Sequence, residues 1–117
     1  MAEKLSNSVK VFFADKDKVL RELRDFAEKL RQTDPAVQRI GYFGSYATDT
    51  FGPASDADLL IILSKSSKRF LDRIPDYIPE NLSIGCDVFP YTKDELEKMK
   101  RDNNPWIRHV LKETVWL

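Results

Sequence analysis

GYFGSYA at residues 41–47 and DADLLIIL at residues 56–63 decide the fold of this chain. The first segment closes a short apolar run with Gly44-Ser45, and ten residues then lead to the acidic pair Asp56 and Asp58. The second segment continues as an unbroken apolar run, which is typical of a strand buried on both faces. We therefore expect two strands joined through a turn and a short helix or loop, with two carboxylates where the second strand begins.

Helices and strands alternate along the rest of the chain. A helix with one apolar face precedes Pro35, and residues 9–13 either extend it or form a separate turn. The other expected elements are strands at 37–43, 58–63 and 84–89, a helix at 66–74 broken by Pro75 and Pro79, a helix from Thr92 through 100, and a last short helix from Asn104-Pro105 that ends near 115–117. This order predicts a mixed α+β (α/β) fold, with helices packed on a small mixed β-sheet in a single domain, residues 1–117.

Length and composition exclude several classes of protein. The chain has 117 residues, of which 42% are hydrophobic and 32% charged, so it can bury one core and is not a disordered tail. Its 19 basic and 19 acidic residues balance, whereas domains that coat nucleic acid usually carry a basic excess. One Cys and one His are too few for a zinc site. A nucleic-acid partner is therefore not expected.

The same sequence bears on location. No apolar run approaches the ~18 residues of a membrane span, and Met1-Ala2-Glu3-Lys4 lacks the apolar core of a signal peptide. A single cysteine forms no internal disulfide. These features predict a cytoplasmic protein that does not associate with a membrane.

Three aspartates stand where an unpaired charge is costly. Alternate strand residues share a face, so Asp56 and Asp58 point the same way, with Cα atoms about 6.5–7 Å apart. Asp87 interrupts a third apolar run, 84–89. If the two strands are neighbours, the three carboxylates make one metal site, which a hard cation such as Mg²⁺ would neutralise. The alternatives are turn or capping roles for Asp56 and Asp58, and an ion pair for Asp87.

The turn at Gly44-Ser45 is a second candidate site. It follows a strand and opens a short helix, so we expect its backbone N–H groups to face outward, and glycine lets a phosphate approach the backbone closely. Taken alone, such a pair is most often an ordinary strand-to-helix turn. A phosphate cradle that faces a carboxylate metal site is the equipment for phosphoryl or nucleotidyl transfer.

These residues together resemble a known family. Gly44-Ser45, ten residues and then Asp56-Ala57-Asp58 are similar to the signature of the minimal nucleotidyltransferases of the polymerase-beta superfamily, and Asp87 resembles their third carboxylate. The short chain and its ending, 104–117, resemble the antitoxins of HEPN–MNT toxin–antitoxin pairs. The resemblance covers most of the chain, from Val37 to the C-terminus.

The resemblance implies a metal-dependent nucleotidyltransferase that moves a nucleoside monophosphate, AMP from ATP, to an acceptor, with a partner toxin protein as one option. It implies that Asp56 and Asp58 bridge two Mg²⁺ ions. Asp87 would hold the catalytic ion and help to orient or deprotonate the acceptor hydroxyl. Gly44 and Ser45 would bind the β- and γ-phosphates of the nucleoside triphosphate.

The alternative function is an antitoxin or binding module with weak or no catalysis, which acts by forming a complex. It is favoured by Thr48-Asp49, where relatives commonly carry a basic residue. For either function, the apolar C-terminal residues 105–117 predict a homodimer or a complex with a HEPN-family protein. The competing expectation is that these side chains close the core beside the first helix.

The remaining conspicuous residues are expected to be structural. Cys86 is expected to act as a small buried apolar side chain, and His109 as a surface or packing residue rather than a general base. Core or partner contacts are expected for the aromatic residues Tyr46, Phe51, Trp106 and Trp116.

Overall fold

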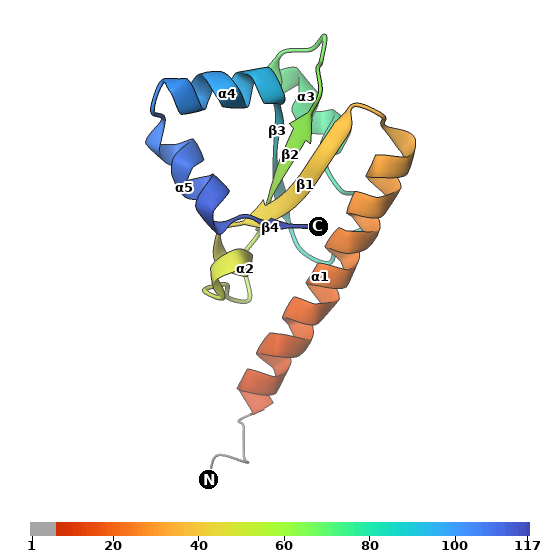
Figure 1. Ribbon diagram of the computed structural model, residues 1–117. Coiled ribbons are helices and arrows are strands. Elements are labelled where there is room, and N and C mark those ends of the chain that lie inside the picture. Colours follow the sequence, from red (N-terminus) through yellow and green to blue (C-terminus); the bar gives the residue numbers. More distant parts are fainter. Residues whose placement is uncertain (1–6) are drawn as a thin grey trace.

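The fold is a four-stranded sheet with helices packed on both faces (Figure 1). The computed structural model describes the backbone of residues 7–117 and the side chains of residues 15–117. The mixed α+β architecture expected from the sequence is confirmed. The elements in chain order are α1 (Asn7–Thr33), β1 (Val37–Phe43), α2 (Ser45–Thr48), β2 (Ala57–Leu63), α3 (Phe70–Tyr77), β3 (Cys86–Thr92), α4 (Lys93–Arg101), α5 (Pro105–Glu113) and β4 (Val115–Trp116).

The strands are ordered β3-β2-β1-β4 across the sheet. β1 pairs antiparallel with both β2 and β4, whereas β2 and β3 run parallel. A parallel pair cannot be joined by a hairpin, and α3 lies on the crossover between β2 and β3. β4 was not expected as a strand, since its two residues are too few to show a periodicity.

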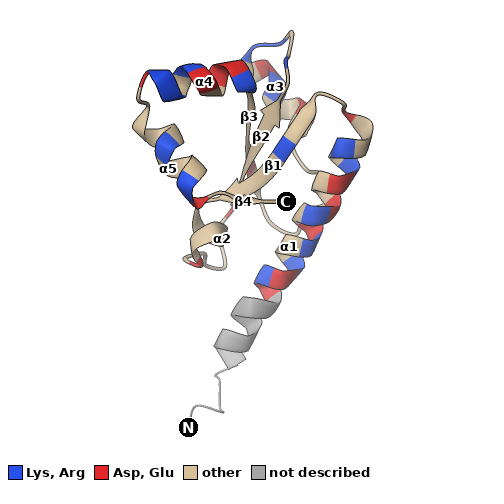
Figure 2. Cartoon of the chain, viewed as in Figure 1, with Lys and Arg blue, Asp and Glu red and all other residues tan. Residues whose placement is uncertain are grey.

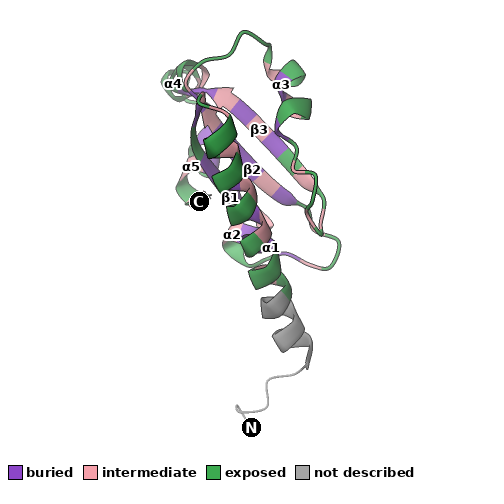
Figure 3. Cartoon of the chain, turned by 90° about the vertical axis from the view of Figure 1, so that its right-hand side faces the viewer, coloured by how far each residue is buried: buried purple, intermediate pink, exposed green. Residues whose placement is uncertain are grey.

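The two faces of the sheet bury different apolar clusters. Leu59 and Ile61 of β2 face the cluster that α1 and α3 cover, whereas Leu60 faces the cluster under α4 and α5. Figure 3 shows buried residues along the strands, with exposed residues on the outer faces of the helices. The apolar run of β2 is therefore unbroken because both of its faces are covered.

The first helix follows the predicted periodicity. It ends at Thr33, just before Pro35, and its backbone includes residues 9–13, so these do not form a separate turn. The N-terminal tetrapeptide used in the signal-peptide argument lies outside the described residues. No helix in the described part of the chain is long and apolar enough to cross a membrane. The residues that form the apolar face of α1 are buried or half-buried: Val19, Leu20, Leu23, Phe26, Ala27 and Leu30.

The helix predicted at 66–74 is displaced to α3, which begins at Phe70 and ends at Tyr77. The Ser66 hydroxyl accepts the N–H of Lys68 at 3.1 Å, a local side-chain bond that holds these residues in a turn. Pro75 lies inside the helix and does not break it as predicted. In so short a helix the proline removes only one possible backbone bond.

The third strand is also displaced, from the predicted 84–89 to β3, Cys86–Thr92. It contains Pro90, which argues against a central strand because proline has no N–H to donate. β3 lies at the edge of the sheet, where the backbone groups on one side of the strand have no neighbouring strand in the described part of the chain to hydrogen-bond with. The position at the edge explains why the strand continues through the proline.

The last two helices begin at the predicted residues. The Thr92 hydroxyl accepts the N–H of Glu95 at 3.2 Å, and the Glu95 carboxylate accepts the Thr92 N–H at 2.8 Å. Asn104 Oδ1 accepts the N–H groups of Trp106 and Ile107 at 2.9 and 3.2 Å. Both caps satisfy backbone donors that the first helical turn leaves unpaired.

A partly buried ion pair ties the crossover helix α3 to α4. The Arg73 side chain donates to both carboxylate oxygens of Glu95, at 2.5 and 3.2 Å. Its Nε also donates to the Lys68 carbonyl at 2.9 Å. Burial alone would raise the pKa of Glu95, but the bonds from Arg73 and Thr92 lower it. The carboxylate therefore stays ionised and holds the two helices together.

Most apolar residues of the C-terminal segment close the core. Ile107 and Val110 are 0% and 1% exposed, and the Trp106 ring packs against an aromatic cluster with Phe43, Phe89 and Tyr91. The Arg39 guanidinium lies 3.7 Å from the centre of the Trp116 ring. Trp106 and Val115 nevertheless keep 38% and 41% of their surface exposed.

This packing predicts a large effect of Ile107→Ala on stability. Loss of a fully buried aliphatic side chain leaves a cavity between α5 and the sheet, and the free energy of unfolding should fall by about 2–5 kcal/mol. Leu71→Ala is the matched control, because Leu71 is 74% exposed and its loss should change stability by less than about 0.5 kcal/mol. Urea unfolding measures both, and equal effects would contradict the assignment of Ile107 to the core.

Candidate functional site

The sheet brings Asp58 and Asp87 side by side. They are register partners on the parallel strands β2 and β3. Strands in a sheet lie about 4.8 Å apart and directly paired residues share a face. Leu60 and Phe89, two residues further along each strand, pack under α4 and α5. The two aspartates therefore continue these rows on the same face, at the N-terminal ends of the strands.

Asp56 joins this pair from the residue before β2. The N–H of Ala57 donates to the Gly85 carbonyl at 2.9 Å, which extends the pairing of the strands by one step. A Cβ on Gly85 would lie 2.3 Å from Asp56 Oδ1, so the glycine gives the carboxylate room against the neighbouring strand. Asp56 and Asp87 are exposed and Asp58 is half-buried. The three carboxylates thus lie together at a solvent-accessible end of the sheet.

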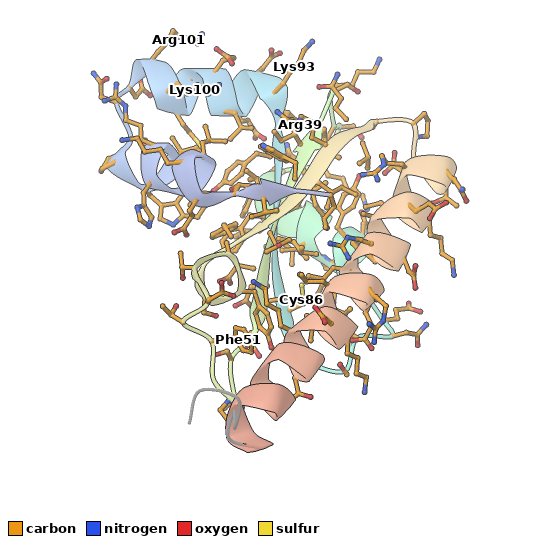
Figure 4. All side chains as sticks on the ribbon, turned by 60° about the horizontal axis from the view of Figure 1, so that its bottom comes forward. Arg39, Phe51, Cys86, Lys93, Lys100 and Arg101 are labelled. Carbon is orange, nitrogen blue, oxygen red and sulfur yellow. The ribbon has the colours of Figure 1, made fainter. Side chains whose placement is uncertain are left out.

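Burial and repulsion both act on Asp58. Burial, followed by the charges of Asp87, Asp56 and Glu113, raises the pKa of Asp58 to about 6. Burial and the charges of Asp87, Asp58 and Asp56 raise the pKa of the Cys86 thiol to about 12, so this side chain is neutral at physiological pH. Cys86 therefore fits its expected role as a small apolar residue, and Figure 4 shows it near this end of the sheet.

The donor set of the site fits a hard cation. Within the described side chains, none of the three aspartates forms an ion pair with Lys, Arg or His. Clustered carboxylates without a basic partner are stabilised by a divalent ion with oxygen ligands. No group of three or more Asp, Glu, His or Cys among the described residues is already arranged to hold a metal ion, so the carboxylates would have to reorient around one.

The turn at Gly44-Ser45 lies directly against Asp58. Gly44 has a φ of 72°, and a Cβ on it would lie 2.3 Å from Asp58 Oδ2, so both the backbone conformation and the close approach require glycine. Ser45 begins α2, and its hydroxyl makes no hydrogen bond to the described part of the chain. The turn expected to cradle phosphates therefore faces the carboxylate site.

Two charged residues hold this turn, and neither was expected from the sequence. Glu113 Oε1 accepts the Gly44 N–H at 2.9 Å, across 69 residues of chain. Lys16 of α1 forms an ion pair with Asp49, which ends α2 in a left-handed conformation. Neither contact leaves a spacing pattern in the sequence, because the two partners are brought together only by the fold.

The aromatic and histidine side chains near the site have structural contacts. Tyr46 and Phe51 are buried and their rings stack with centres 4.3 Å apart. His109 is exposed, with its Nε2 3.3 Å from Glu113 Oε2. Basic and acidic residues are interspersed along α1, whereas α4 is acidic in its first turn and basic in its last (Figure 2).

The sequence and the fold were compared with known proteins. The family model for the nucleotidyltransferase domain matches residues 21–116. The fold resembles a solved structure from Sulfolobus solfataricus, named as a candidate nucleotidyltransferase, with a TM-score of 0.64 and 18% identity over 90% of this chain and 84% of that one. A search of curated proteins finds no match. Since the family model spans most of the chain, this protein belongs to the nucleotidyltransferase domain family and is an enzyme of nucleotidyl transfer.

Proposed function

We propose that this enzyme transfers a nucleoside monophosphate, AMP from ATP, to an acceptor hydroxyl in a reaction that depends on Mg²⁺. The observation that carries the proposal is the position of Asp58 and Asp87 as register partners, with Asp56 beside them and Gly44-Ser45 against them. In the reaction the acceptor oxygen bonds to the α-phosphorus, the bond from that phosphorus to the bridging oxygen breaks, and pyrophosphate leaves.

The three aspartates would hold the metal. When bound, Mg²⁺ supplies positive charge to the phosphate oxygens and to the attacking and leaving oxygens. Asp87 is exposed at the edge strand, and it orients the acceptor hydroxyl and accepts its proton. Asp56 and Asp58 would bind the metal from the β2 side of the site.

Gly44 and Ser45 would bind the β- and γ-phosphates. The Gly44 N–H is already bonded to Glu113, so the turn contributes chiefly the Ser45 hydroxyl and the close approach that a glycine permits. The charge of Asp49 does not stand alone near the phosphates, because Lys16 forms an ion pair with it. This ion pair weakens the argument for an inactive protein that Thr48-Asp49 suggested.

Asp58→Asn should abolish nucleotidyl transfer. An amide keeps the size of the side chain but loses the charge that binds a divalent ion, and we expect a fall in rate on the order of 100-fold or more. Transfer is measured with Mg²⁺ and ATP labelled at the α-phosphorus. Asp72→Asn is the matched control, because Asp72 forms a surface ion pair with Arg69 on α3 and its loss should leave transfer intact. A rate for Asp58→Asn within tenfold of wild type would overturn the metal role.

The same substitution should stabilise the metal-free fold at high pH. Because the pKa of Asp58 is raised from 3.8 to about 6, the folded state binds more protons than the unfolded state between these values. The carboxylate therefore destabilises the fold increasingly as the pH rises toward about 6, and fully above it. In EDTA, the melting temperature of Asp58→Asn should exceed that of wild type at about pH 8, and the difference should vanish near pH 4.

Added Mg²⁺ should reverse this order. It should raise the melting temperature of wild type at about pH 8, raise it less at about pH 5 where protons compete for Asp58, and leave Asp58→Asn almost unchanged. Circular dichroism during heating measures the melting temperature of both proteins at both pH values. An equal shift in both proteins would mean that the ion binds elsewhere.

A complex with a HEPN-family protein, or a homodimer, is part of the proposal, as is a cytoplasmic location. The C-terminal surface available for it consists of Trp106 and Val115. The second candidate function, an antitoxin that acts by binding alone, uses the same surface. Label on the partner after incubation with ATP supports the enzyme, and a tight complex without label supports the binding module.

Val115→Glu should weaken this association. A charge at the short edge strand β4 would have to be buried in any interface formed there, whereas Leu71→Glu on α3 places the same charge on a remote exposed site. Light scattering during size-exclusion chromatography at micromolar concentration measures the mass, alone and with the HEPN-family protein. A monomer of 13.6 kDa under every condition would contradict the association.

A further inference from the structure

Glu113 connects the end of α5 to the turn beside the proposed phosphate site. Its Oε1 accepts the Gly44 N–H at 2.9 Å, and its Oε2 lies 3.3 Å from His109 Nε2. The carboxyl-bearing side chain is only 18% exposed, whereas that of His109 is 72% exposed. The bond to Gly44 is thus the shielded contact of Glu113, and the contact with His109 faces solvent.

The backbone around Glu113 is fixed on both sides. The preceding turn of α5 is buried through Val110, and the Thr114 hydroxyl donates to the Val110 carbonyl at 2.6 Å. Beyond Thr114 the chain pairs with β1, where Trp116 is opposite Gly41. A Cβ on Gly41 would lie 2.4 Å from Thr114 Cγ2, so this crossing is as close as the backbone allows. Glu113 is therefore held in place by a helix end and by a strand.

A small displacement of Gly44, which donates to Glu113, would change the geometry of the proposed site. Gly44 passes so close to Asp58 that an added Cβ would lie 2.3 Å from Oδ2, and Ser45 follows it directly. A rotation of the Gly44 peptide would move the Ser45 hydroxyl relative to the carboxylates. A side-chain acceptor that is itself held in place restrains that rotation more strongly than water would.

We propose that Glu113 is a positioning residue that fixes the Gly44-Ser45 turn for the phosphates of the nucleotide, and that it is not a metal ligand. This inference rests on the proposed function. The group that binds phosphate is then Ser45, and Glu113 acts on it through the peptide of Gly44. The C-terminal helix thereby takes part in substrate binding although it contains none of the three aspartates.

The test compares Glu113→Ala with Glu113→Gln. The amide oxygen of Gln can still accept the Gly44 N–H, whereas Ala removes the acceptor. Glu97→Ala is the control for loss of a carboxylate, because Glu97 forms a surface pair with Lys100 on α4. Retained melting transitions identify folded variants, and Glu113→Gln keeps the test valid if the alanine variant is unstable.

Two measurements are independent of turnover. In the first, NMR hydrogen exchange of the Gly44 amide should accelerate by tenfold or more in Glu113→Ala and stay near wild type in Glu113→Gln and Glu97→Ala. In the second, calorimetric titration with MgATP should show about tenfold weaker binding for Glu113→Ala alone. The rise in melting temperature caused by Mg²⁺ without nucleotide should persist in all three variants.

Each failure has a distinct meaning. Unchanged Gly44 exchange in Glu113→Ala would overturn the inference even if wild type binds MgATP. Tighter MgATP binding by Glu113→Ala would also overturn it, because the carboxylate would then be blocking an N–H that the phosphates use. Loss of the Mg²⁺ effect in Glu113→Ala would make Glu113 a ligand instead. A wild-type protein that binds no MgATP would refute the proposed function itself, whatever the exchange at Gly44 shows.

Discussion

The parallel pairing of β2 and β3 places two carboxylates next to each other, and this placement constrains the rest of the structure. Asp58 and Asp87 are opposite in register and share a face, so the strand pairing keeps the two residues adjacent. Repulsion and burial raise the pKa of Asp58 to about 6. A hydrophobic pair would make the sheet more stable, and the cation that we propose would relieve the repulsion.

The parallel pair also dictates how the chain is routed. A parallel connection requires a crossover, and the segment that contains α3 provides it. The partly buried bonds from Arg73 to Glu95 fix that helix to α4, directly after β3. The antiparallel partner β1 then ends beside the start of β2, where Phe43 is paired with Asp58. The next residue, Gly44, lies against Asp58, so strand order brings the proposed phosphate turn to the proposed metal site.

Local patterns were sufficient to predict most of the fold and to single out the three aspartates as candidate site residues. Helix periodicity, the caps at Thr92 and Asn104 and the apolar run of β2 depend on neighbouring residues, and each lies where the sequence indicated. The errors fell where tertiary position decides the outcome. Pro90 is accepted because β3 is an edge strand. Glu113 and Lys16 were missed for the same reason, since their partners Gly44 and Asp49 lie far away in sequence.

The energetic cost of the site separates the two candidate functions. A binding module would profit from replacing the half-buried Asp58 by a neutral residue, because the metal-free carboxylate destabilises the fold above pH 6. The close approach of Gly44, where an added Cβ would lie 2.3 Å from Asp58 Oδ2, crowds the same carboxylate. Glu113 adds a further negative charge to the same place, although a neutral acceptor could hold the Gly44 N–H. Features that lower stability and converge on one turn are expected where chemistry requires them, and they favour the enzyme.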